Sequence, residues 1–85
     1  MSRYTISNLR TDVAKINDWC KSDGIPVRLI EQGRNGYQAI DEYPVDADGN
    51  REGTGVNRNV CCGTSRECAH EAEAWYNQMH RRYRS

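Results

Sequence analysis

The N-terminal segment spaces its apolar residues with the period of an α-helix. Apolar side chains recur at intervals of three and four, at Ile6, Leu9, Val13, Ile16 and Cys20. This spacing places them in one stripe along a helix surface. Thr5 or Ser7 can cap the start of the helix, and Gly24 with Pro26 marks its end. The pattern therefore predicts a helix over residues 6–22.

Two runs of β-prone residues follow, separated by Asn35-Gly36, a pair typical of a two-residue hairpin turn. They predict strands near residues 26–33 and 37–44. The polar segment VDADGNREGTG comes next, and the run VNRNVCC predicts a third strand over about residues 55–62. DADGN lacks the residue order of an EF-hand calcium loop, so it predicts a turn. Whether the whole 45–55 loop is ordered is left open.

The C-terminal segment has the clearest helical pattern. Thr64 and Glu67 form a T-x-x-E capping box. An apolar stripe follows at Cys68, Ala72, Trp75, Tyr76, Met79 and Tyr83. Acidic residues lie early in the segment and arginines at its end, which complements the helix dipole. We therefore expect one α+β domain over residues 1–85, in the order α-β-β-β-α, with two helices packed on one face of a three-stranded antiparallel sheet.

Charge and hydropathy exclude few classes of function. The 85 residues include 12 basic and 12 acidic side chains, so the net charge favours neither nucleic acid nor an acidic partner. There is no apolar run long enough to cross a membrane, and the N-terminus lacks the apolar core of a signal peptide. We expect a cytoplasmic protein with reduced thiols and no membrane partner.

Three cysteines and a histidine lie within the stretch VCCGTSRECAH. Cys61 and Cys62 are neighbours in a predicted strand, so their side chains point to opposite faces. Cys68 and His70 diverge around a helix. This geometry opposes a shared metal ion, and no metal or other cofactor is expected. We expect Cys20, Cys62 and Cys68 to be buried thiols and Cys61 to face outward and be reactive. A disulfide among the first three remains the alternative.

The chain has no sequence motif of an enzyme. It contains no P-loop, no G-x-S-x-G and no H-E-x-x-H. A chain of this size buries only about 60–65% of its unfolded surface, which leaves little room for a deep pocket. We therefore expect a binding protein rather than an enzyme.

The hairpin register predicts which side chains face a partner. If Arg34 pairs with Tyr37, then Val27, Leu29 and Ile40 face the helices. The other face carries Ile30, Ala39, Asp41, Asn57 and Asn59 together with four candidate partner-binding residues. These four are Arg28, Arg34, Tyr37 and Tyr43. Tyrosine and arginine are the types enriched at interface hot spots. The same face could also be the surface of a homodimer, so the oligomeric state is left open.

Nucleic acid is the alternative partner. The tail HRRYR places Arg81, Arg82 and Arg84 beside an aromatic residue, where they could contact phosphates. The exposed tyrosines of the sheet face could stack on bases.

The α-β-β-β-α order resembles the double-stranded-RNA-binding domain, whose two helices pack on one face of a three-stranded sheet. The lysine-rich start of that family's second helix is replaced here by Thr64-Ser65-Arg66-Glu67. Its histidine-bearing loop is replaced by Gly33-Arg34-Asn35-Gly36. These departures remove the main RNA contacts, so the resemblance implies the fold and not the activity.

The stretch GTSRECAHEAEAWYNQM resembles the closing helix of small accessory proteins of phages and prophages. Some members of that group inhibit host defence or host enzymes by binding a protein. The resemblance implies a non-enzymatic protein whose partner is a host or phage protein.

Overall fold

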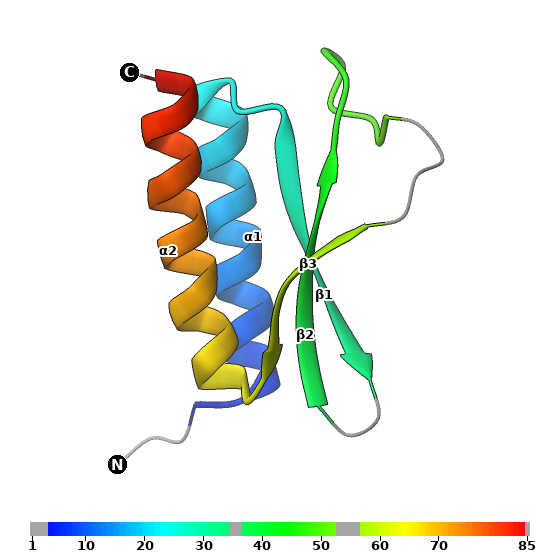
Figure 1. The fold of residues 1–85 in the computed structure, drawn as a ribbon, viewed down its shortest axis with the longest axis vertical. Coiled ribbons are helices and arrows are strands. Elements are labelled where there is room, and N and C mark those ends of the chain that lie inside the picture. The colour runs from blue at the N-terminus through cyan, green and yellow to red at the C-terminus, as the bar shows by residue number, and fades with distance from the viewer. Residues whose placement is uncertain (1–3, 35–36, 53–56, 85) are drawn as a thin grey trace.

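The computed structural model describes residues 4–34, 37–52 and 57–84. Its elements are α1 (Ile6–Asp23), β1 (Val27–Arg34), β2 (Tyr37–Pro44), β3 (Arg58–Gly63) and α2 (Ser65–Arg84) (Figure 1). The order α-β-β-β-α and the α+β class are confirmed.

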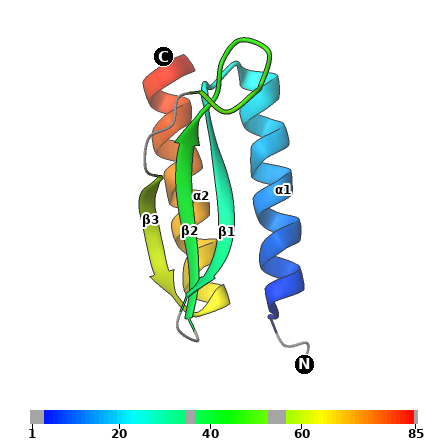
Figure 2. The ribbon, with the colours of Figure 1, turned by 90° about the vertical axis from the view of Figure 1, so that its right-hand side faces the viewer.

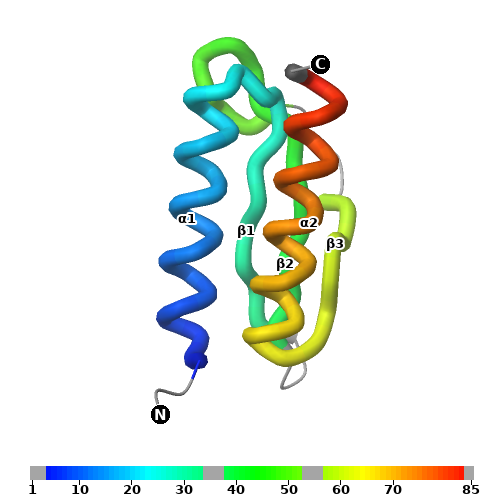
Figure 3. Tube along the Cα trace, turned by 90° about the vertical axis from the view of Figure 1, so that its left-hand side faces the viewer, coloured from blue at the N-terminus to red at the C-terminus, as the bar shows by residue number. Residues whose placement is uncertain are grey.

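The three strands form one antiparallel sheet in the order β1-β2-β3. Both helices run in the same direction on one side of this sheet (Figures 1 and 3). α2 lies over β2 and β3, whereas α1 lies alongside β1. In the described part of the chain, no helix covers the opposite face, which we call the outer face (Figure 2).

The core lies between the helix layer and the sheet. Its buried members are Leu9, Val13, Ile16 and Cys20 on α1, Ile25, Leu29 and Ile40 at the sheet, and Cys68, Ala72, Trp75 and Met79 on α2. The predicted helix stripes are thus confirmed, except at Ile6, which is only half-buried in the first turn of α1, and at Tyr83. That residue is 43% exposed because it lies in the last turn of α2, beyond Met79, the last core residue of the helix.

Local signals define the ends of the helices. Thr5 and Asn8 form a capping box at the start of α1, and Gly24 ends that helix with φ 71°, a left-handed conformation that glycine adopts readily. At the start of α2, the Glu67 N–H donates to Thr64 Oγ1 at 3.1 Å and the Thr64 N–H donates to Glu67 Oε1 at 3.3 Å. The predicted T-x-x-E capping box is confirmed.

The free edge of β1 is closed by a side chain of α1. Asn17 Nδ2 donates to the Leu29 carbonyl oxygen at 2.9 Å, and the Leu29 N–H donates to Asn17 Oδ1 at 2.8 Å. The amide therefore supplies both hydrogen bonds that a neighbouring strand would make. Next to it, Arg10 Nε contacts Glu31 Oε2 at 3.1 Å and ties α1 to the same strand.

A bulge in β3 reverses the predicted orientation of two cysteines. Asn59 pairs with Asp41 and Cys61 pairs with Ile40, which leaves Val60 as an extra residue. Cys61 therefore lies on the helix-facing side and packs against the core, and Cys62 is exposed on the outer face. The prediction of a buried Cys62 and an outward Cys61 was wrong because it assumed unbroken alternation along the strand.

The segment after β2 folds as a turn, as predicted for DADGN. Asp46 Oδ1 accepts hydrogen bonds from the N–H groups of Asp48 at 2.9 Å and Asn50 at 3.0 Å. Val45 and Arg51 form an isolated bridge that closes the turn. The last part of the predicted 45–55 loop, residues 53–55, lies outside the described residues. Among the described helices, none has the length and apolar character to cross a membrane.

Candidate functional site

The predicted partner-binding residues of the sheet lie on one face, as expected. Arg28 pairs with Tyr43 across the hairpin, and Arg34 pairs with Tyr37. The side chains of Arg34 and Tyr37 lie outside the described part of the chain. Arg28 Nη1 donates to the carbonyl oxygen of Val27 at 2.8 Å and is also bonded to that of Ile25. One nitrogen of its guanidinium group is therefore held by the backbone.

Tyr43 is half-buried and is covered by a neighbouring cation. The Arg51 guanidinium carbon lies 5.3 Å from the centroid of the Tyr43 ring. In the centre of the same face, Ala39 and Asp41 have no exposed surface, and Asp41 Oδ1 accepts a hydrogen bond from Asn59 Nδ2 at 2.9 Å. The outer face is thus more closed than the pattern of tyrosines and arginines suggested.

A groove of about 450 Å³ lies between the two helices. It is lined by Tyr4, Asp12, Lys15, Ile16 and Trp19 on one side and by Arg66, Ala69, His70, Glu73 and Asn77 on the other. All of these residues belong to the helices except Tyr4, which directly precedes α1. The groove therefore opens away from the sheet and combines both signs of charge with apolar surface.

Trp19 stands at one end of this groove with 44% of its surface exposed. Its ring centroid lies 5.2 Å from that of Tyr76, and the two planes meet at 51°. The Tyr76 hydroxyl donates to Asp23 Oδ2 at 2.5 Å, and the centroid of the His80 ring lies 5.8 Å from that of the Tyr76 ring. These contacts fix Tyr76 between both helices, and Tyr76 in turn supports one face of the exposed indole.

The other end of the groove is held by Tyr4. Its hydroxyl donates a hydrogen bond to Asp12, and the Arg66 guanidinium carbon lies 5.9 Å from its ring centroid. Burial raises the pKa of the Tyr4 hydroxyl well above its usual 10.0, and the hydrogen bond to Asp12 adds to the shift. Tyr4 therefore stays a neutral donor across the physiological range.

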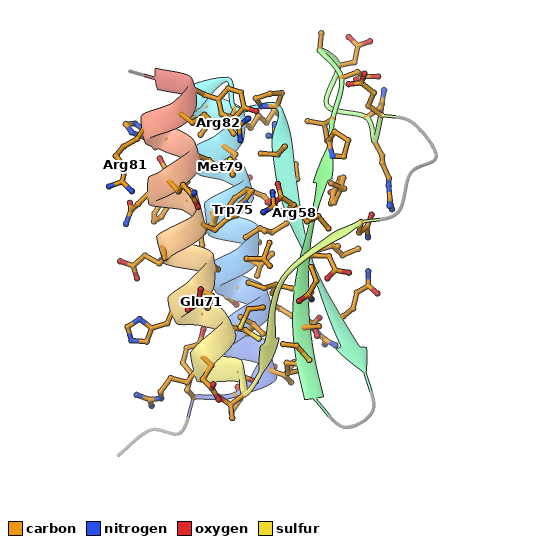
Figure 4. All side chains as sticks on the ribbon, viewed as in Figure 1. Arg58, Glu71, Trp75, Met79, Arg81 and Arg82 are labelled. Atoms are coloured by element: carbon orange, nitrogen blue, oxygen red, sulfur yellow. The ribbon has the colours of Figure 1, made fainter. Side chains whose placement is uncertain are left out.

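Two of the C-terminal arginines, Arg81 and Arg82, do not form a common patch. Arg81 points away from the sheet, whereas Arg82 lines a second groove with Arg58 and Glu42 between α2 and β3 (Figure 4). Consecutive residues of a helix are about 100° apart around its axis, so the two side chains diverge. The side chain of Arg84 lies outside the described residues.

Metal binding finds no support in the arrangement of side chains. Within residues 4–34, 37–52 and 57–84, no three His, Cys, Asp or Glu side chains are grouped so that they could hold an ion. The four cysteines are all free, and Cys20 and Cys68 are buried as predicted.

Sequence reasoning missed Trp19. It directly precedes Cys20, a member of the buried stripe of α1. The sequence pattern assigned it to the helix and gave it no role in binding. The available signal was its place three residues after Ile16 and directly beside Cys20, since a large aromatic residue next to such a stripe falls on the rim of the buried face.

Comparisons with protein-family models, with curated proteins and with solved structures find no match to this chain. The function must therefore be argued from the chain's own surface.

Proposed function

We propose that this chain is a small non-enzymatic binding protein that captures another protein through the groove between α1 and α2. The exposed and supported indole of Trp19 is the observation that carries the proposal. Tryptophan is among the residues most enriched at binding hot spots, because a large rigid ring gains much buried area for little lost entropy. The half-exposed ring of Trp19 can therefore be buried by a partner.

The groove also indicates the chemistry of the partner. Lys15 and Arg66 offer positive charge, Asp12 and Glu73 offer negative charge, and Trp19 offers an apolar contact. A protein segment that places an apolar side chain on Trp19, with charged residues of both signs beside it, complements this surface.

The resemblance to small accessory proteins of phages supports a host or phage protein as the partner, and inhibition of a host factor or defence system as the outcome of binding. The absence of enzymatic motifs in the sequence agrees with action by contact alone. We propose that this takes place in the cytoplasm. The sheet residues Arg28, Arg34, Tyr37 and Tyr43 remain the second candidate surface.

The test uses two matched variants on opposite sides of the domain. A partner is first captured from a cell lysate with the wild-type protein, purified, and titrated calorimetrically against Trp19→Ala and Tyr43→Ala. We expect Trp19→Ala to weaken binding at least tenfold and Tyr43→Ala to leave it unchanged, with both variants folded by circular dichroism. If Tyr43→Ala weakens binding and Trp19→Ala does not, the binding site lies on the outer face and not in the groove.

The rival hypothesis is that the partner is a nucleic acid. Fluorescence anisotropy with labelled duplex DNA, single-stranded DNA and duplex RNA at low and moderate salt tests it directly. Tight binding whose affinity falls steeply with salt would support a nucleic acid as the partner. Arg81, Arg82 and Arg84 would then be the candidate phosphate contacts.

A further inference from the structure

The thiols of Cys61 and Cys68 meet where β3 joins α2. Cys68 is fully buried in the core, and Cys61 packs against the same cluster. Each thiol also influences the pKa of the other, as two neighbouring thiols do. Cys68 Sγ also lies 3.5 Å from the Gln38 carbonyl oxygen, two residues along β2 from Ile40, which is the residue opposite Cys61. These contacts place both thiols on the helix-facing side of the sheet, beside neighbouring residues of β2.

The bulge in β3 is what creates this pair. Without the extra residue Val60, Cys61 would point to the outer face and Cys62 would face the core. Gly63 and the capped turn at Thr64 then reverse the chain within a few residues, so that the first turns of α2 return to the helix-facing side of β3. The neighbouring Cys62 is exposed on the other side of the strand.

We propose that Cys61 and Cys68 form a reversible intramolecular disulfide in the presence of a small disulfide oxidant such as oxidised glutathione, and that Cys62 takes no part in it. This inference is independent of the groove between the helices. It assigns a redox modification site to the junction of strand and helix.

The reaction proceeds as two thiol–disulfide exchanges. The Cys61 thiolate attacks one sulfur of oxidised glutathione, the S–S bond of the oxidant breaks, and one reduced glutathione leaves. The Cys68 thiolate then attacks the Cys61 sulfur, and a second reduced glutathione leaves. The protein gives up two electrons and two protons in all, and the oxidant is reduced to two thiols.

Burial controls the rate of this reaction. It raises the pKa of the Cys68 thiol from 9.0 to about 12, and it raises that of Cys61 as well. Because the thiolate is the nucleophile, the exchange is slow at neutral pH and accelerates as the pH rises. Cys61, which is only half-buried, is the residue that the oxidant reaches first.

The experiment incubates the reduced, folded protein with oxidised glutathione at pH 8 and follows the intact mass. We expect wild type and Cys62→Ser to lose the mass of two hydrogens, with peptide mapping joining Cys61 to Cys68. Cys61→Ser should form no internal disulfide. Dithiothreitol should restore the original mass. Because the wild-type map identifies the pair, the test does not depend on the core variant folding.

Three results would overturn the proposal. One is a link that contains Cys62, another is a disulfide between two chains, and the third is a protein that carries only glutathione adducts under conditions that oxidise a control dithiol peptide. A melting temperature that rises by several degrees in the oxidised form, and falls back on reduction, would support a native pair, since a bridge formed without distortion stabilises the fold.

Discussion

The indole ring of Trp19 lies 5.2 Å from the phenol ring of Tyr76, so that a half-exposed side chain of α1 rests on a side chain of α2. Tyr76 is itself bonded through its hydroxyl to Asp23 at the end of α1. The exposed ring is thus supported by a contact between the two helices, which pre-organises it for a partner without the ordering cost of a mobile side chain.

The two tryptophans should respond differently to a quencher in solution. Trp19 is 44% exposed and Trp75 is 5% exposed. We expect acrylamide to quench the fluorescence of Trp75→Phe, which retains only Trp19, several times more strongly than that of Trp19→Phe. Addition of the true partner should protect Trp19 from quenching. Equal quenching of both variants would contradict the exposed position of Trp19.

The side chain of Asn17 should contribute more to the free energy of unfolding than the side chain of an exposed helical asparagine does. Asn17→Ala leaves the Leu29 N–H and C=O without their partners, at a cost of about 1–3 kcal/mol. Asn77→Ala is the matched control, because Asn77 is exposed on α2; it should change stability by less than about 0.5 kcal/mol. Urea unfolding measures the free energy of unfolding of both variants. Equal losses would contradict the role of the Asn17 side chain as hydrogen-bond partner of the β1 edge.

The order of the elements was predictable because its signals are local. The stripes of α1 and α2 depend on residues three and four apart, and the capping box depends only on Thr64 and Glu67. The hairpin register followed from one turn, and the pairing of Arg34 with Tyr37 confirms it. None of these signals needs knowledge of the tertiary structure.

The orientation of the cysteines was not predictable in the same way. It depends on one extra residue, Val60, whose place in the strand is set by the pairing of β3 with β2. The glycine of the run RNVCCG stands at the end of the strand and not at the bulge. A register shift of one residue exchanges the faces of a strand, so Cys61 and Cys62 changed places while Asn59 kept its predicted face.

The candidate binding surface in the structure differs from the predicted one for a related reason. Arg28 was expected to face a partner, and one nitrogen of its guanidinium group donates to the carbonyl oxygens of Ile25, before β1, and Val27, the first residue of β1. Trp19 was not expected to matter, and its exposure depends on how two helices distant in sequence approach each other. Residue type suggested hot spots, but only tertiary contacts decide which side chains remain available.

The four thiols should react in an order set by their exposure. Cys62 is exposed, Cys61 is half-buried, and Cys20 and Cys68 have no exposed surface. We expect a chromogenic disulfide reagent at pH 8 to label Cys62 rapidly, Cys61 slowly, and the other two only after unfolding. Cys62→Ser should abolish the rapid phase and leave the slow one. A rapid phase that persists in this variant would contradict the bulged register of β3.

Alkaline pH should weaken the fold through the buried thiols. Burial raises the pKa of Cys20 from 9.0 to about 11, so the unfolded chain loses this proton at a lower pH than the folded protein does. The stabilisation is complete below pH 9 and is lost as the pH rises through about 11. A difference of two pKa units corresponds to about 3 kcal/mol at most, an upper figure for this one thiol.

A pair of cysteine variants separates this effect from general alkaline damage. Cys20→Ala should be less stable than wild type at pH 8, because it leaves a small cavity, but its free energy of unfolding should fall less steeply between pH 9 and 11. Cys62→Ala makes the same substitution at an exposed position and is the control for the change of side chain itself. Urea unfolding at a series of pH values measures the slopes. If Cys20→Ala loses stability as steeply as wild type, ionisation of Cys20 is not coupled to unfolding, and the alkaline sensitivity must come from the other groups whose pKa values burial raises, which are Cys61, Cys68 and Tyr4.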